Sequence, residues 1–116
     1  MKNKLSEKKC VSCEGGIPAL SKDETRQYLT ALKDWRLSED AKSIRAEYPM
    51  KDFMAAVRLI NQIAEIAERE DHHPDIHLAG YRKLAIELTT HAIGGLSEND
   101  FILAAKIDEL PKALKA

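Results

Sequence analysis

Apolar and polar residues recur with two different periods along the chain, and these periods separate the predicted helices from the predicted strands. The clearest helical pattern runs from residue 51 to residue 70, where apolar side chains recur at steps of three or four. The expected buried stripe of this helix is Phe53, Val57, Ile60, Ala64 and Ala67. Its opposite face carries Arg58, Asn61, Glu65, Glu68 and Arg69. The pattern therefore predicts an amphipathic helix with one face in a core.

Two shorter helices are expected, one before and one after this helix. Ser21 followed by Glu24 has the form of a capping box, and the residues after it predict a helix over about 22 to 33. Ser97 followed by Asp100 is a weaker capping pattern of the same kind. The apolar positions that define the final helix are Phe101, Ile102, Ala105 and Leu110.

The segments between the helices alternate apolar and polar residues, as strands with one face in a core do. "DWRLSEDAKSIRAEYP", residues 34–49, contains two such alternations around a polar turn and predicts a β-hairpin. Its expected inward positions are Trp35, Leu37, Ile44, Ala46 and Tyr48. "IHLAG" and "RKLAIELTTH" predict two further strands around Gly80, and the second of them is expected to end at His91.

The order of these elements is α-β-β-α-β-β-α, which predicts an α+β fold. We expect a four-stranded antiparallel sheet with three helices packed on one face. The length of 116 residues allows one domain, at residues 21–116, preceded by an N-terminal arm at residues 1–20 that is mobile in part. The bare face and the open edges of such a sheet favour pairing with a second copy of the chain.

Composition narrows the classes of partner and compartment. Charged residues make up 32% of the chain but the net charge is only -1, so neither nucleic acid nor an anionic membrane surface is an expected partner. No apolar run approaches the roughly 20 residues that cross a bilayer, and the first residues lack the pattern of a secretory signal. We therefore expect a cytoplasmic protein. Cys10 and Cys13 are then expected to be thiols on a solvated arm rather than half of a zinc or redox motif.

The candidate chemistry lies in "EDHHPDIH", residues 70–77, which holds three of the four histidines. Pro74 disfavours a helical conformation at His73, so the long helix should end near Asp71 and deliver His72 and His73 into a connection. His91, at the expected end of the last strand, could meet them in one pocket. Histidines accept and donate protons near neutral pH, so this cluster favours general acid-base catalysis.

Carboxylates surround the cluster, and one of them is a candidate orienting group. Glu68 lies one helical turn before His72, and the nearby acidic residues are Glu70, Asp71 and Asp75. A carboxylate bonded to one ring nitrogen would fix the tautomer of a histidine and raise its basicity.

A zinc site built from the histidines is the competing interpretation. Its ligands would be His72, His73, His77 and His91. Adjacent histidines tend to point in different directions, and this spacing matches neither a pair one helical turn apart nor a zinc finger. We therefore expect no metal, and we expect His77 to be a surface residue of the sheet.

The arrangement of these residues resembles the pterin-4a-carbinolamine dehydratase family, which includes the dimerization cofactor of a homeodomain transcription factor. The resemblance runs from about Ser21 to Asp108. It is carried by Glu68, "DHHP" at 71–74, Tyr81 and "THAIGGLSENDF" at 90–101. It implies an α+β fold with helices on one face of a four-stranded antiparallel sheet, assembled as dimers or tetramers.

The resemblance also implies the reaction and the roles of the site residues. Family members remove water from a 4a-hydroxytetrahydropterin, a product of aromatic amino acid hydroxylases, to give quinonoid dihydropterin without a metal or organic cofactor. The implied acid-base residues are His72 and His91, with His73 as a positioning group that shares the acid role. Glu68 is the implied orienting residue. The other implied substrate-binding or supporting residues are Asp71, Pro74, Tyr81, Thr90 and Asp100.

Two departures and two alternatives accompany the resemblance. Ile76 stands where the family often has an aromatic residue, and Asn99 stands where it often has an arginine, so the lining of the pocket is expected to differ. One alternative function is a non-catalytic pterin-binding or dimerization partner. The other is action on a different pterin, such as one in molybdenum cofactor metabolism.

Overall fold

The computed structural model of the protein describes residues 5–8, 10 and 18–115. The predicted α+β fold and its element order are confirmed, with a short 3-10 helix added at each of two places. The elements are η1 (Leu5–Glu7), α1 (Lys22–Leu29), β1 (Trp35–Leu37), β2 (Ile44–Pro49), α2 (Phe53–Glu70), β3 (Asp75–Ala79), β4 (Lys83–Leu88), η2 (His91–Ile93) and α3 (Glu98–Asp108).

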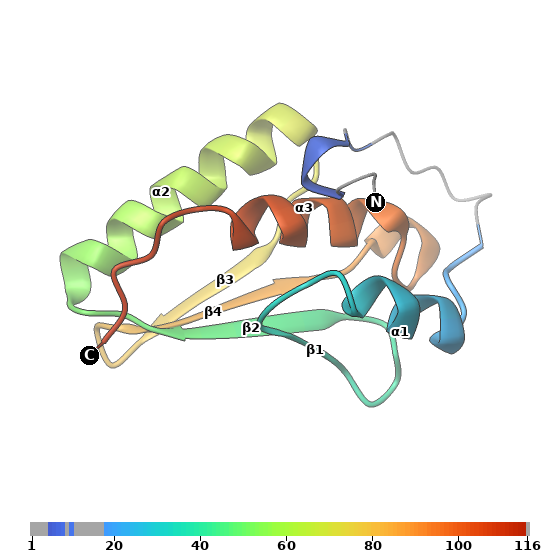
Figure 1. The fold of residues 1–116 in the computed structure, drawn as a ribbon, viewed down its shortest axis with the longest axis horizontal. Helices are drawn as coiled ribbons and strands as arrows, with labels where there is room; N and C mark the ends of the chain where they lie inside the picture. Colours follow the sequence, from blue (N-terminus) through green and yellow to red (C-terminus); the bar gives the residue numbers. More distant parts are fainter. Residues whose placement is uncertain (1–4, 9, 11–17, 116) are drawn as a thin grey trace.

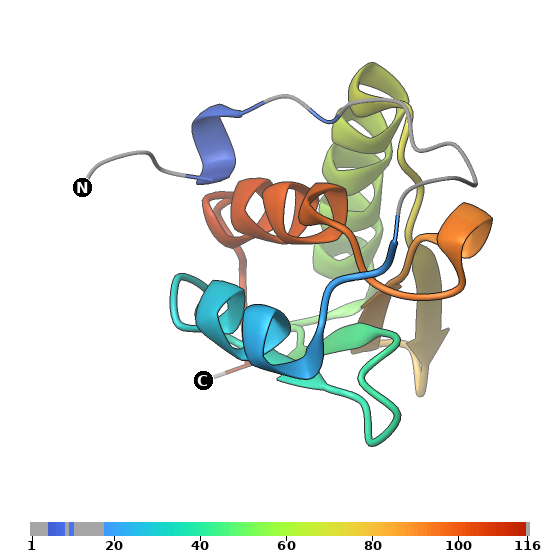
Figure 2. The same cartoon turned by 90° about the vertical axis from the view of Figure 1, so that its right-hand side faces the viewer.

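The four strands form one antiparallel sheet in the order β1-β2-β4-β3. The registers align Trp35 with Ala46, Ala46 with Ile86 and Ile86 with Ile76, so one row of apolar side chains crosses the whole sheet. The helices lie over this face in Figure 1, and the same strands contribute the buried residues of the core. Within the described residues, the opposite face carries no helix (Figures 1 and 2).

The first helix is shorter than the predicted span of 22–33. Its capping box forms as expected, with the Ser21 N–H 2.8 Å from Glu24 Oε1 and the Glu24 N–H 3.1 Å from Ser21 Oγ. The helix ends at Leu29 because the N–H groups of Thr30 and Ala31 donate to carbonyls three residues back, which tightens the chain into a turn.

The buried face of α2 also differs from the predicted stripe. The structure buries Ala55, Ala56, Leu59, Ile63, Ile66 and Ala67, so only Ala67 of the predicted set is buried. Phe53 is 50% exposed, Ala64 is exposed, and Val57 and Ile60 are partly buried. The helix has apolar residues over a wide arc, and packing against α3 and into the core shared with the sheet buries one side of that arc. A second apolar stripe therefore lies at the surface.

The last strand ends earlier than predicted, at Leu88 rather than at His91. Thr90 and Gly95 form an isolated antiparallel bridge, in which the Thr90 N–H lies 2.9 Å from Gly95 O. Residues 91–94 are thereby folded into a tight loop, and Gly94 adopts the left-handed conformation that closes it (φ 66°). His91 consequently begins η2 and does not belong to the strand.

The described part of the N-terminal arm packs against α3. Leu5 contacts the hydrophobic core, and Cys10 is partly buried rather than solvated as predicted. Cys13 and its predicted state lie outside the described residues. None of the helices in the described part of the chain has the length and apolar character to cross a membrane.

Candidate active site

The end of α2 sends the two adjacent histidines in different directions. Asp71 takes the left-handed conformation (φ 53°), and the N–H groups of both Asp71 and His72 return to the carbonyl of Ala67. The chain leaves the helix within one residue, as predicted, and Pro74 leads into β3. His72 then reaches the first turn of α3, whereas His73 folds back onto α2.

His72 forms a buried pair with Asp100. His72 Nε2 lies 2.6 Å from Asp100 Oδ1, and the two side chains are 11% and 0% exposed. Because a carboxylate can only accept, Nε2 carries the hydrogen in this bond. In the neutral imidazole, Nδ1 is then the acceptor.

Asp100 connects this histidine to the segment that carries His91. Its Oδ2 accepts from Thr90 Oγ1 at 2.7 Å and from the Ser97 N–H at 3.0 Å. Asp100 is the third residue of α3 and completes a capping box with Ser97, so the same carboxylate stabilises the helix start and orients His72. Thr90 directly precedes His91, whose side chain is exposed. One buried carboxylate thus joins the end of α2, the segment after β4 and the start of α3.

His73 forms a second pair, with Glu68, at the surface. His73 Nε2 lies 2.6 Å from Glu68 Oε2, and the side chains are 54% and 77% exposed. The predicted orienting carboxylate therefore binds His73 and not His72. Water screens this pair, so it fixes the ring less firmly than Asp100 fixes His72.

Three predicted site residues stand apart from these pairs. Asp71 is exposed in the helix cap and Pro74 is partly buried beside it. Tyr81 lies on the β3–β4 turn, which Figure 1 shows at the opposite end of the sheet, and it is 57% exposed. The five residues of β3 separate that turn from His73 by about 16 Å. One copy of the chain does not bring Tyr81 to the histidines.

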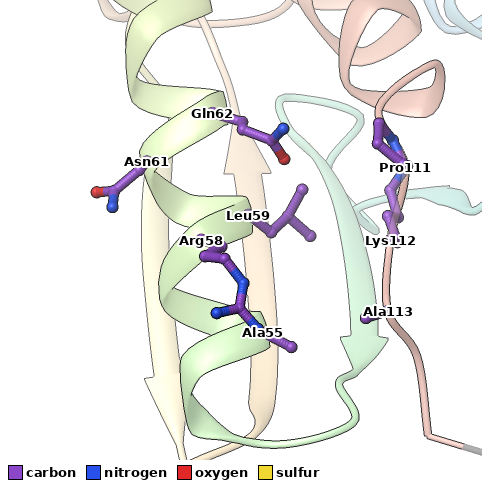
Figure 3. Close-up of a pocket in the computed structure, with 8 residues that line it drawn as sticks. All are labelled: Ala55, Arg58, Leu59, Asn61, Gln62, Pro111, Lys112 and Ala113. Carbon is purple, nitrogen blue, oxygen red and sulfur yellow. The ribbon is translucent and has the colours of Figure 1, made fainter.

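A cavity of about 610 Å³ lies elsewhere, between the first half of α2 and residues 111–113 (Figure 3). It is lined from α2 by Ala55, Arg58, Leu59, Asn61 and Gln62. Gln62 is about 12 Å along the helix axis from its last residue, Glu70. Burial lowers the pKa of Lys112, whose Nζ donates to the carbonyls of Ile107 and Leu110 and so caps α3. The cavity is therefore separate from the two histidine pairs.

The described residues contain no group of three or more His, Cys, Asp or Glu side chains placed to hold a metal ion. The divergence of His72 and His73 explains why these two do not form such a group. Other links around the pairs were not predicted from sequence. Glu70 contacts Cys10 and Lys106, residues far from it in the chain, and no local pattern marks such contacts.

Comparison with known proteins gives the family. Residues 18–110 match the family model described as pterin 4 alpha carbinolamine dehydratase. A Nitrosospira multiformis protein, provisionally named as such a dehydratase, is 50% identical over 106 residues, covering 91% of each chain. The mitochondrial pterin-4-alpha-carbinolamine dehydratase 2 of Arabidopsis thaliana is 43% identical over 91% of this chain and 58% of its own length.

A solved structure agrees with these matches. The crystal structure of a transcriptional coactivator/pterin dehydratase from Brucella melitensis superposes with a TM-score of 0.72 at 31% identity, covering 77% of this chain and 94% of that one. The family match spans both histidine pairs and the segment that carries His91. The chain belongs to the pterin-4-alpha-carbinolamine dehydratase family.

Proposed function

We propose that this protein removes water from a 4a-hydroxytetrahydropterin to give quinonoid dihydropterin, by general acid-base catalysis with histidines. The observation that carries the proposal is the connection through Asp100, which holds the His72 segment and the His91 segment at one end of the molecule. Family membership supplies the class of substrate. Regeneration of tetrahydrobiopterin is the process in which we place the reaction.

The dehydration needs one proton donor and one proton acceptor. The C4a–O bond breaks as the lone pair of N5 forms the C4a=N5 double bond, the departing hydroxyl takes a proton and leaves as water, and N5 loses its own proton. Hydroxide is a poor leaving group, so the donor matters most. Protein side chains suffice for both transfers because the pterin nitrogen supplies the electron pair.

Exposure suggests how the three histidines divide these tasks. His73 and His91 are exposed and accessible to a bound ring, whereas His72 presents only a small part of its surface. We assign proton transfer to all three, with His72 held in a fixed orientation by Asp100 and His73 held loosely by Glu68. We assign a supporting role to Asp71, Pro74, Thr90 and Asp100, which hold in place the segments that carry the three histidines.

The test is the rate at which freshly generated 4a-hydroxytetrahydropterin is dehydrated, followed by stopped-flow absorbance. We expect His91→Ala and His73→Ala each to lower kcat by a factor of about 100 or more, because general acid-base groups contribute about 100-fold to 10,000-fold. His77→Ala is the matched control, since His77 is exposed on β3 and outside both pairs. A wild-type rate equal to the uncatalysed rate would refute the activity.

A functional link to an aromatic amino acid hydroxylase follows from the substrate, because such enzymes produce the 4a-hydroxy adduct. Action on another pterin, such as one in molybdenum cofactor metabolism, is the competing assignment. Turnover measured side by side with several reduced pterins separates the two. The assignment fails if the biopterin-type adduct is not the one turned over.

We also propose that the chain forms a homodimer or homotetramer through α2 and the neighbouring sheet edge. The second apolar stripe of α2, formed by Phe53, Val57, Ile60 and Ala64, is partly or largely exposed. The edge strand β3 adds the partly buried Ile76 and Leu78. An edge strand and an apolar helix stripe can each pair with their own copy about a two-fold axis.

The oligomer is tested by sedimentation of variants of α2. Val57→Glu places a charge in the stripe and should yield monomers, whereas Gln62→Glu, on the side of α2 that lines the cavity, should not. If the wild type sediments as a monomer, the stripe serves another purpose. A non-catalytic role as an assembly partner, suggested by the description of the Brucella protein as a transcriptional coactivator, would then be the alternative.

A further inference from the structure

We propose that Glu70 is a positioning residue for the His72–Asp100 pair. Through Glu70, an N-terminal strap formed by residues 5–8 and 10 keeps the two side chains of the pair at hydrogen-bonding distance. Glu70 lies two residues before His72, and the strap also contacts Asn99, the residue before Asp100. Each half of the pair is therefore anchored from the same segment. The kinetic part of this inference rests on the proposed dehydratase function.

The strap runs along α3 in the direction opposite to the helix. Near the helix end, Ser6 Oγ donates to Glu109 Oε2 at 2.7 Å, and the Ser6 carbonyl accepts from Lys106 Nζ at 2.7 Å. Near the helix start, Lys8 Nζ lies 2.7 Å from Glu98 Oε2. Figure 2 shows the described part of the arm passing over α3 towards the end of α2.

At the start of α3 the strap reaches α2. The Cys10 N–H donates to Glu70 Oε1 at 2.8 Å, and the Cys10 thiol lies 3.6 Å from the carbonyl of Asn99. One residue of the strap thus contacts the neighbours of both His72 and Asp100. A shift of Cys10 would be transmitted to both elements that carry the pair.

Burial makes Glu70 the centre of this arrangement. Its side chain is 8% exposed, and its other oxygen, Oε2, lies 3.8 Å from Lys106 Nζ, which is 19% exposed. A buried carboxylate is costly unless charged and hydrogen-bonding partners accompany it. Because Lys106 also binds the strap carbonyl of Ser6, the placement of Glu70 and the docking of the strap depend on each other.

The thiol of Cys10 provides a reporter of strap docking. Burial, reinforced by the charge of Glu70, raises the pKa of this thiol to about 12, and the charge of Asp100 acts in the same direction. A neutral, partly buried thiol reacts slowly with alkylating reagents. Detachment of the strap exposes Cys10 and speeds the reaction.

The experiment compares full-length Glu70→Ala, Glu70→Gln and Glu65→Ala in a Cys13→Ser background, where Cys10 is the remaining cysteine. Glu65 is the matched control because it is an exposed glutamate of the same helix. Three measurements are made at mildly alkaline pH: the rate of Cys10 alkylation by iodoacetamide, the low-field imidazole N–H proton signal of the His72–Asp100 bond, and the kcat and KM of pterin dehydration.

For Glu70→Ala we expect alkylation to accelerate about tenfold, the imidazole signal to broaden or vanish, and kcat to fall about tenfold with little change in KM. Glu70→Gln keeps an oxygen that can accept from Cys10 and should recover part of each effect. Glu65→Ala should match the wild type. Thermal melting of each variant checks that it is folded. If Glu70→Ala does not fold, the three measurements on Glu70→Gln test the inference.

Two results would overturn the inference. Unchanged alkylation in both Glu70 variants would mean that Glu70 does not hold the strap. Faster alkylation with an unchanged imidazole signal would mean that the strap docks without positioning the pair. If the wild type does not dehydrate the pterin, the proposed function fails, while alkylation and the imidazole signal still test the strap.

Discussion

The two histidine–carboxylate pairs have the same nitrogen–oxygen distance but different surroundings. Nitrogen and oxygen are 2.6 Å apart in both, yet Asp100 is fully buried beside a nearly buried His72, whereas Glu68 and His73 are mostly exposed. Asp100 also accepts from Thr90 and from the Ser97 N–H. Removing a partner from a buried network leaves donors unsatisfied, while water replaces a partner lost at the surface. The nitrogen–oxygen distance alone therefore does not tell which pair contributes more to stability.

The largest effect is expected from breaking the buried pair. Asp100→Ala leaves His72 Nε2, Thr90 Oγ1 and the Ser97 N–H without their acceptor, so we expect the free energy of unfolding to fall by about 3 kcal/mol or more. Urea denaturation followed by circular dichroism measures this. Asp100→Asn, which keeps one oxygen, should lose less. Equal stability of Asp100→Ala and the wild type would contradict the network.

A smaller effect is expected from removing one donor of the same carboxylate. Thr90→Val keeps the shape of the buried side chain but removes the hydroxyl that donates to Asp100, which should cost about 1 to 2 kcal/mol of unfolding free energy. Thr30→Val, exposed at the end of α1, is the control and should cost less than about 0.5 kcal/mol. If both variants lose the same amount, the Thr90–Asp100 bond contributes little to the network.

The docking of the strap is expected to depend on pH through Cys10, which contacts Glu70 and Asn99 near the buried pair. Its pKa is raised to about 12 in the docked strap, so the docked state favours the neutral thiol. The resulting stabilisation is complete below the thiol's ordinary pKa near 9.0 and is lost as the pH rises towards 12. With allowance for the partial exposure of Cys10, we expect the free energy of strap docking to weaken by about 1 kcal/mol between neutral pH and pH ~10.

The measurement for this prediction is hydrogen exchange of the strap amides in wild type and Cys10→Ala at the two pH values, corrected for intrinsic exchange. The wild type should lose protection at high pH, and Cys10→Ala should show a weaker pH dependence. An identical pH dependence in both proteins would show that another group controls docking.

The smallest effect is expected from breaking the exposed pair. Glu68→Ala should change the free energy of unfolding by less than about 0.5 kcal/mol, because exposed ion pairs contribute little. Added salt should reduce this difference further. Urea denaturation at low and high ionic strength tests both points. A loss as large as that of Asp100→Ala would show that exposure does not distinguish the two pairs.

The order of elements and the end of α2 followed from local patterns. Alternating residues predicted the hairpin of β1 and β2, and Pro74 with the change of periodicity placed the helix end near Asp71, where the structure has it. Such features depend on neighbours in the sequence, so single-sequence reasoning reaches them. The capping pattern of Ser97 and Asp100 was also recognised, although its link to His72 was not.

The sequence by itself determined the fold class and singled out the histidines that we propose as acid-base residues, because periodicity, turn residues and the histidine motif are local properties. The tertiary structure decided which apolar stripe of α2 is buried, since either side of a wide apolar arc can face a core. It also decided that Asp100 binds His72 while Glu68 binds His73, and that Tyr81 lies at the far end of the sheet. These outcomes depend on how helices and strands distant in sequence pack together, because packing sets both burial and the direction of each side chain.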